Sequence, residues 1–172
     1  MGERGYHAIS IQMIADAIGV TKGTIFHHFK NKEGILLAIL DEVGPVSLKI
    51  LSLIVENEKL SGMEKLESAI RFDLDLVARK SNFLKILFSE SRHLSEQNRR
   101  RYQHYEREFV DLTEGLIKQV QSEDRKHFNK MSPRIVAHAI LGMCLWTNMW
   151  LSTGERKIAE DEVVDHFMRI LN

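Results

Sequence analysis

The stretch that decides the fold is residues 10–29, Ser-Ile-Gln-Met-Ile-Ala-Asp-Ala-Ile-Gly-Val-Thr-Lys-Gly-Thr-Ile-Phe-His-His-Phe. Its apolar residues recur at helical spacing on both sides of a glycine, which predicts two short helices joined by a tight turn. Ser10 and Thr21 are each placed to cap a helix, because their hydroxyls can accept a hydrogen bond from an early backbone N–H. Gly19 lies where the chain turns sharply, since a residue without Cβ adopts positive φ at little cost. The stretch therefore predicts a helix-turn-helix.

The second of these helices has two different sides. Ile25 and Phe29 give it an apolar side, which is expected to pack inward. Small and polar residues on the other side suit a short helix that enters a DNA groove. A helical hairpin that never contacts DNA is the alternative, but the length of the turn, the second cap and the polar side together favour DNA binding. The polar side holds Lys22, Gly23, Thr24, His27 and His28.

A longer string around this stretch carries a family resemblance. Its residues are Gly5-Tyr6-His7-Ala8, Ile14-Ala15, Gly19-Val20, Lys22-Gly23-Thr24, His28-Phe29 and Lys32-Glu33-Gly34-Ile35-Leu36. The string resembles the TetR (tetracycline-repressor) family of one-component transcriptional regulators. The resemblance implies an all-helical subunit, with a DNA-binding domain expected over 1–43 and a ligand-binding and dimerisation domain over 44–172.

Two features depart from the family pattern. Family members carry one more helix before the Gly-Tyr pair, whereas only Met1 to Arg4 precede Gly5. A truncated chain or an unseen first helix is therefore expected. Phe26 stands where the family commonly has a tyrosine that contacts a phosphate, so the ring is kept and that contact is lost.

The expected contacts to DNA are of two main kinds. Lys22 and His27 are candidates for contacts to base edges, which carry sequence specificity. Contacts to phosphates, which position the helix, are expected from Thr21, Thr24 and Lys32. A glycine in the helix permits close approach of the backbone. The complete expected set is Thr21, Lys22, Gly23, Thr24, Phe26, His27 and Lys32.

Composition limits the remaining interpretations. The chain has 172 residues, with 24 basic and 24 acidic side chains, and this balance argues against a nonspecific nucleic-acid coat. Two prolines and long helical spacing predict an all-α fold. The single cysteine, Cys144, lies in an apolar run and indicates a buried thiol in a reducing cytoplasm. The apolar stretch over 140–151 is too short and interrupted to cross a bilayer.

The residue patterns do not support a catalytic function or a metal site. The eight histidines lack metal-ligand spacing, and we find neither a nucleophile-and-base pair nor a cofactor motif, so an enzyme is not expected. Arg99-Arg100-Arg101 is interpreted as a solvated helix start, although one of these arginines at the mouth of a ligand pocket is the alternative. Helices are expected over 32–57 (kinked near Pro45), 61–79, 82–91, 96–121, 132–152 and 161–171.

The C-terminal part contains a methionine- and tryptophan-rich stretch. Residues 141–147, with Trp150, a turn at Gly154 and an acidic helix start, look like the C-terminal domain of TetR regulators of fatty-acid and sterol-chain degradation, which respond to acyl-CoA thioesters. The bulky residues of this part are expected to be shielded from solvent and to line a cavity for an elongated apolar group. Ordinary core or dimer packing is the alternative. The expected ligand-binding set is Phe88, Met143, Trp146 and Trp150.

These observations together predict a cytoplasmic, homodimeric repressor that binds a palindromic operator in double-stranded DNA. A small apolar effector, with acyl-CoA as the first candidate, would release it. In the family the last two helices pair with those of a second subunit. The residues expected to offer such a surface here are Ile135, Ala139 and Gly142 on one helix and Val163, Val164, Phe167, Ile170 and Leu171 on the other. Two alternatives remain: a truncated ligand-binding dimer without DNA binding, and a helical lipid carrier or enzyme.

Overall fold

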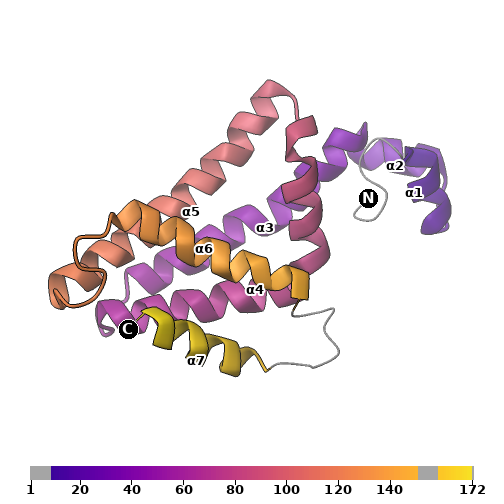
Figure 1. Cartoon of the computed structure of the whole chain (residues 1–172). Coiled ribbons are helices and arrows are strands. Elements are labelled where there is room, and N and C mark those ends of the chain that lie inside the picture. The colour runs from indigo at the N-terminus through magenta and orange to yellow at the C-terminus, as the bar shows by residue number, and fades with distance from the viewer. Residues whose placement is uncertain (1–8, 151–158, 172) are drawn as a thin grey trace. The chain divides into compact units, whose positions relative to one another are not determined.

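The computed structural model describes residues 9–150 and 159–171, and all regular structure within these ranges is helical (Figure 1). The predicted all-α fold is confirmed. The expectations for residues 5–8, for the helix end at 151–152 and for the turn at Gly154 lie outside the described residues. The helices are α1 (Ile11–Ala17), α2 (Lys22–Phe29), α3 (Lys32–Val55), α4 (Gly62–Glu90), α5 (Glu96–Glu123), α6 (Pro133–Trp150) and α7 (Glu160–Leu171), with a short 3-10 turn, η1 (Ser91–His93), between α4 and α5.

The predicted helix boundaries agree with this order, with one informative difference. The two helices expected on either side of residues 80–81 form a single helix, α4, which is bent at Lys80, where φ is −112° and ψ is 21°. Pro45 lies inside α3, and the helix continues through it. The sequence analysis placed a helix end at this position, and the structure has a bend within one helix instead.

The contacts divide the chain into two compact units. The first unit comprises the residues up to Val46 together with Asn82–Tyr105, and the second comprises Ser47–Ser81 and the residues from Glu106 onward. Helices α3, α4 and α5 each contribute to both units. The division into domains 1–43 and 44–172 stays a prediction.

The first unit is organised around the start of α3. Its buried residues are Leu36, Leu40, Leu87, Leu94 and Tyr102. Glu33, in the first turn of α3, accepts hydrogen bonds from the backbone N–H of Ser95 at 2.7 Å and from Nδ2 of Asn98 at 2.8 Å. These bonds, that from Asn98 most strongly, lower the pKa of the Glu33 carboxyl. The carboxylate therefore caps the start of α5 and ties it to α3.

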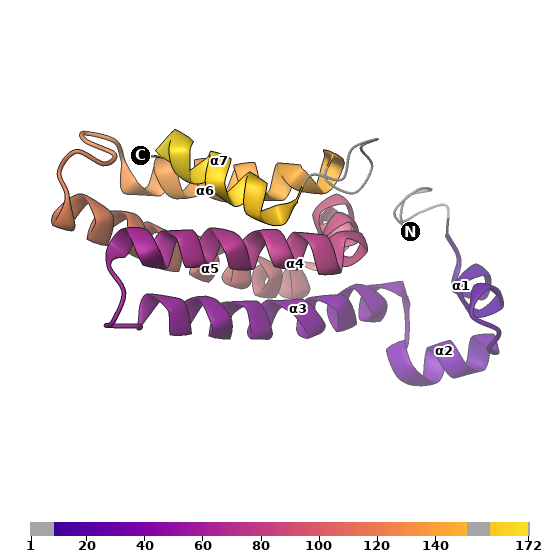
Figure 2. The ribbon, with the colours of Figure 1, turned by 90° about the horizontal axis from the view of Figure 1, so that it is seen from below.

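The second unit is a helical bundle. Within it the later turns of α3 pack beside α4 and α5 (Figure 2), through Leu51, Ala69 and Leu116. A larger apolar cluster joins α4, α5, α6 and α7. Its members are Leu66, Ile70, Leu74, Ile117, Val120, Phe128, Val136, Ile140, Cys144, Val163 and Val164.

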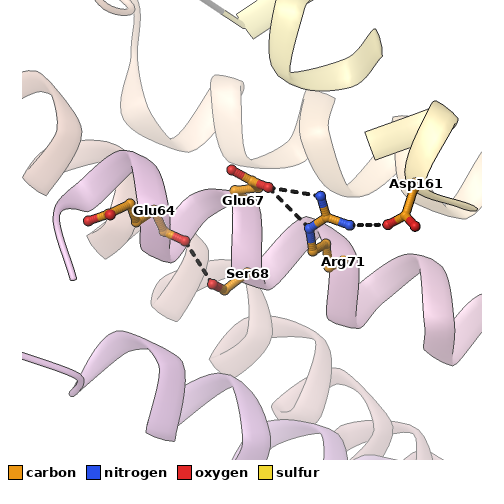
Figure 3. A network of polar contacts seen from close by, with 5 residues as sticks. All are labelled: Glu64, Glu67, Ser68, Arg71 and Asp161. Atoms are coloured by element: carbon orange, nitrogen blue, oxygen red, sulfur yellow. Dashed lines mark hydrogen bonds and ion pairs between the residues drawn. The ribbon is translucent and has the colours of Figure 1, made fainter. Parts of the chain in front are cut away.

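An ion-pair network fastens α7 to α4 at the surface of this bundle (Figure 3). Arg71 donates from Nη1 to Asp161 at 2.5 Å, and from Nη2 to Glu67 at 3.0 Å. One turn before Arg71, Ser68 Oγ donates to the carbonyl of Glu64 at 2.8 Å. Arg71 thus joins one carboxylate of its own helix to another in the first turn of α7.

Candidate functional site

The helix-turn-helix has the caps and the turn that the sequence predicts. Ser10 Oγ accepts the backbone N–H of Met13 at 3.1 Å, and Thr21 Oγ1 accepts that of Thr24 at 3.1 Å. Gly19 adopts a φ of 71°, in the left-handed region. Ala15 and Ile25 are buried where α1 and α2 pack together. The two helices therefore hold each other in a fixed geometry.

Helix α2 presents its polar side to solvent. The exposed residues are Thr21, Lys22, Gly23, Thr24, Phe26, His27 and His28. The ammonium of Lys22 lies 5.6 Å from the ring centroid of Phe26, one turn further along the helix. This cation–π contact brings the two side chains to the same side of α2. Six of the seven residues expected to contact DNA are thus accessible on one short helix and its cap.

Lys32, the seventh, is placed differently. It is half-buried, and its Nζ donates to the backbone carbonyl of Ile9 at 2.8 Å. The ammonium therefore holds the chain just before α1 against the start of α3. A bond across 23 residues has no signature in the sequence, so pattern analysis missed this role; the phosphate contact stays a prediction.

Part of the apolar surface of α1 faces solvent. Ile18 is 62% exposed, and Met13 is exposed as well. Ile18 is the C-cap residue of α1 rather than a member of the helix, with a φ of −109° and a ψ of 6°. Helix α1 therefore ends one residue before Ile18.

The expected ligand-binding residues differ in their exposure. Met143 and Trp150 are half-buried, and Trp150 packs against the large apolar cluster of the second unit. Trp146 is 65% exposed, and Phe88, which belongs to the first unit, is 47% exposed. The expectation that all four are shielded from solvent is therefore wrong for Phe88 and Trp146. The reason at Trp146 is helical geometry, since a residue two positions from buried Cys144 lies about 200° around the helix.

The exposed side of α6 carries a continuous apolar stripe, which we call the α6 stripe. Its residues follow a spacing of four and three, as in the seams of paired helices. All of them are exposed in the single chain. They are Ile135, Ala139, Gly142, Trp146 and Met149.

The basic run Arg99-Arg100-Arg101 on α5 is exposed, which agrees with its interpretation as a solvated helix start. Arg100 pairs with Glu96 on the same helix, and Arg101 pairs with Asp41 of α3. These carboxylates neutralise two of the three arginines locally. The alternative, in which one of the three lies at the mouth of a ligand pocket, stays untested.

The sequence analysis did not predict a buried acid on α4. Asp73, on α4, is only 8% exposed. Burial raises the pKa of its carboxyl to about 7. The signal was readable in principle, because Asp73 stands three residues after Ile70 and four before Val77, within the inward stripe of the helix.

Other kinds of site are not apparent in the part of the chain that the structure describes. No group of three or more His, Cys, Asp or Glu side chains in that part could hold a metal ion. Cys144 is a buried thiol, as predicted, and burial raises its pKa. None of the described helices combines the length and apolar character that a bilayer span needs.

Two family models match the chain. Residues 1–39 match "Bacterial regulatory proteins, tetR family", and residues 59–171 match "Tetracyclin repressor-like, C-terminal domain". The matched families are transcriptional regulators rather than enzymes. Their two parts follow one another in the order that the sequence resemblance implied.

Individual relatives point in the same direction. A fatty acid metabolism regulator protein of Bacillus subtilis (strain 168) is 28% identical over 127 residues, 73% of this chain and 65% of that protein. The transcriptional repressor KstR2 of Rhodococcus jostii (strain RHA1) is 28% identical over 67% of this chain and 56% of its own length. The matched region thus spans less than two thirds of these curated relatives.

A solved structure shares the fold over nearly the whole chain. The crystal structure of AibR in complex with isovaleryl coenzyme A and operator DNA is 26% identical, with a TM-score of 0.81. The similarity covers 99% of this chain and 90% of that one.

Proposed function

Because the chain belongs to the TetR family of transcriptional regulators, we propose that it is a DNA-binding repressor that an acyl-CoA effector releases from its operator. The observation that carries this proposal is the exposed polar side of α2, held in place by two capped helices and a left-handed glycine. We assign contacts to base edges to Lys22 and His27 and phosphate contacts to Thr21, Thr24 and Lys32, with Gly23 and Phe26 on the same surface. The protein would act in the cytoplasm, where its operator lies.

The effector class is supported by the relatives. One relative is named for fatty acid metabolism, and another was solved with isovaleryl coenzyme A and operator DNA. Met143 and Trp150 are the expected ligand-binding residues that are half-buried in the second unit. An effector releases the operator only if it binds the non-DNA-binding conformation more tightly than the other.

The proposal includes a homodimer, because two α2 helices must reach successive major grooves about 34–36 Å apart, or a multiple of that distance. The α6 stripe supplies the apolar surface for the second copy. Small residues at Ala139 and Gly142 allow close approach of the helices, and a Cβ at position 142 would meet no atom within 4 Å. Trp146 lies within this surface, whereas Val163 and Val164 of α7, which were expected on it, are buried in the core.

A gel-shift titration with genomic operator fragments tests DNA binding. Lys22→Ala should weaken binding by ~1–3 kcal/mol if Lys22 contacts a base edge. If it contacts only phosphate, binding should weaken on all sequences alike and the salt slope should fall by about one. A long-chain acyl-CoA added to the wild-type complex should release the DNA.

Lys118→Ala provides a matched control, because Lys118 is an exposed lysine of α5 that pairs with Glu114. It should leave both affinity and salt slope unchanged. Wild-type protein that binds no fragment would favour the two alternatives, a ligand-binding dimer without DNA binding or a helical lipid carrier or enzyme.

Trp146→Asp tests the dimer. A charge in the centre of an apolar seam should raise the dimer dissociation constant at least ~30-fold, about 2 kcal/mol, since buried tryptophans dominate such interfaces. Sedimentation velocity over a concentration series measures the change. Leu53→Asp, at a similarly exposed leucine on α3, is the control and should remain dimeric. Equal association of the two variants would remove Trp146 from the interface.

A further inference from the structure

Asp73 is a buried acid without a partner. It lies on the inner side of α4 in the second unit, between Ile70 and Val77, both buried. Among the described residues its carboxyl has no hydrogen bond and no ion pair. Polar groups in protein interiors nearly always have partners, because removing them from water without one costs several kcal/mol. The carboxyl group therefore calls for a partner from outside the chain, either water or a ligand that takes its place.

The carboxyl oxygens keep some solvent-accessible surface. Among the described residues, two buried side-chain atoms lack both solvent contact and a hydrogen bond: Glu90 Oε2 and His127 Nδ1. The oxygens of Asp73 also lack a hydrogen bond, but they do not lack solvent contact. They consequently keep contact with a space that a water molecule can enter. A donor group of similar size can enter the same space.

Helix α6 lies near Asp73. The charge of Asp73 contributes to the raised pKa of Cys144, which lies on the inner side of α6. Two turns beyond Asp73 along α4, Ser81 Oγ donates to Oδ1 of buried Asn148 at 2.5 Å. The amide Nδ2 of Asn148 lies 3.5 Å from the carbonyl of Ser81, at the outer limit of a hydrogen bond.

Polar groups thus recur along the contact between α4 and α6. Asp73 and Ser81 are separated by about 12 Å along the helix, at 1.5 Å per residue. The large apolar cluster of the second unit includes residues of both helices that carry this row, among them Leu74 of α4 and Ile140 of α6. A row of polar atoms in an otherwise apolar interior matches an occupant that is mostly apolar but carries donor groups along its length.

We propose that Asp73 is a binding residue of the effector site in the second unit, where it accepts a hydrogen bond from an amide N–H or a hydroxyl group of an elongated, mainly apolar effector. The inference rests on the proposed function in one respect only, that the protein binds an effector. It adds that the effector carries a hydrogen-bond donor that reaches the carboxyl group of Asp73. An amide in the arm of a thioester or a hydroxyl group on an alkyl chain satisfies this requirement.

The chemistry of Asp73 suits this role. With a pKa raised to about 7, the carboxyl exists in both protonation states near neutral pH. In either state one oxygen accepts a hydrogen bond. A site that holds a buried acceptor discriminates strongly against an analogue that lacks the donor, because the acceptor is then left without a partner.

The test compares four probes of equal chain length: decanoyl-CoA and decanoyl-pantetheine, which carry amide N–H groups, 1-decanol, which carries a hydroxyl, and methyl decanoate, which carries no donor. Dissociation constants are measured by calorimetry and by tryptophan fluorescence. Asp73→Leu and Asp73→Ala should weaken the donor-bearing probes about 5- to 100-fold, the loss of one buried hydrogen bond. Asp73→Asn, which keeps an acceptor oxygen, should stay within about 5-fold of the wild type.

Asp75→Asn is the matched control, since Asp75 is 40% exposed on the same helix and pairs with Arg79. Its affinities should equal those of the wild type. Methyl decanoate should bind the wild type weakly, and Asp73→Leu and Asp73→Ala should not weaken it further, because these variants remove the acceptor that it leaves without a partner. Because Asp73→Ala is smaller than Asp73→Leu, at least one of the two should keep the fold, as thermal unfolding will report.

The outcomes distinguish a failure of the role of Asp73 from a failure of the acyl-CoA proposal. Equal binding of the donor-bearing probes to wild type, Asp73→Leu and Asp73→Ala overturns the role of Asp73 and leaves the acyl-CoA proposal standing. If decanoyl-CoA does not bind the wild type while 1-decanol binds in an Asp73-dependent way, the acyl-CoA proposal fails and the role of Asp73 stands. If no probe binds the wild type, both are overturned.

Discussion

Replacing Asp73 with asparagine is expected to stabilise the protein at neutral pH and to remove a loss of stability that the wild type suffers between about pH 4 and pH 7. Burial raises the pKa of Asp73 from 3.8 to about 7. Between these two values the folded state keeps the proton that the unfolded state releases. The unfolding free energy therefore falls as pH rises through this window, and it is flat with respect to this group below pH 3.8 and above pH 7.

The expected size of the effect follows from the same two values. At ~1.36 kcal/mol per pH unit, the wild type loses up to about 4 kcal/mol across the window. The measurement is urea unfolding at half-unit pH intervals for both proteins. The unfolding free energy of Asp73→Asn minus that of the wild type should rise with pH by this amount. Taking the difference cancels carboxylates such as Glu33 and Glu123, whose lowered pKa values give the opposite slope at acidic pH.

Asp75→Asn again serves as the control. Asp75 lies on the same helix, but its exposed carboxylate keeps contact with water in the folded state. Its difference curve should vary by less than ~1 kcal/mol, the usual size of an exposed ion pair. A difference curve for Asp73→Asn that is equally flat would mean that the carboxyl is solvated in the folded protein, and it would weaken the case for a partner from the effector.

The sequence predicted those features of the fold that depend on neighbouring residues. The caps at Ser10 and Thr21 and the left-handed turn at Gly19 are local, because each needs only three or four residues to form. The position of the irregularity at Lys80 was also predicted, although as a break between two helices rather than as a bend within one. Local hydrogen bonding and periodicity carry the information for these features.

Features that depend on distant residues were missed or misplaced. The bond from Lys32 to Ile9 and the bonds from Ser95 and Asn98 to Glu33 join segments that no local pattern connects. Trp146 was assigned to a cavity because bulky side chains usually lie inside, but its angle from Cys144 turns it outward. The alternating spacing of four and three residues that begins at Ile135 already places Trp146 on the exposed side of α6.

Replacing Gly34 with alanine is expected to reverse the usual effect of this substitution in a helix. Alanine normally stabilises a helix relative to glycine by about 0.5–1 kcal/mol. A Cβ at position 34 would instead lie 1.9 Å from the carbonyl oxygen of Phe29 and 2.9 Å from its carbonyl carbon. Both atoms belong to the backbone at the end of α2, so no side-chain rotation relieves the overlap. The end of α2 must move away from α3.

The cost should fall on the helix-turn-helix. We expect Gly34→Ala to destabilise the packing of α1 and α2 by roughly 3 kcal/mol or more, at the upper end for overpacked sites, and to abolish operator binding at concentrations where the wild type is saturated. Amide hydrogen exchange should accelerate over residues 11–29. Gly115→Ala on α5, where a Cβ meets no atom within 4 Å, should stabilise by about 0.5–1 kcal/mol and leave DNA binding intact. If the two variants behave alike, α2 is not held against α3 through Gly34, and the position of the recognition helix depends on other contacts.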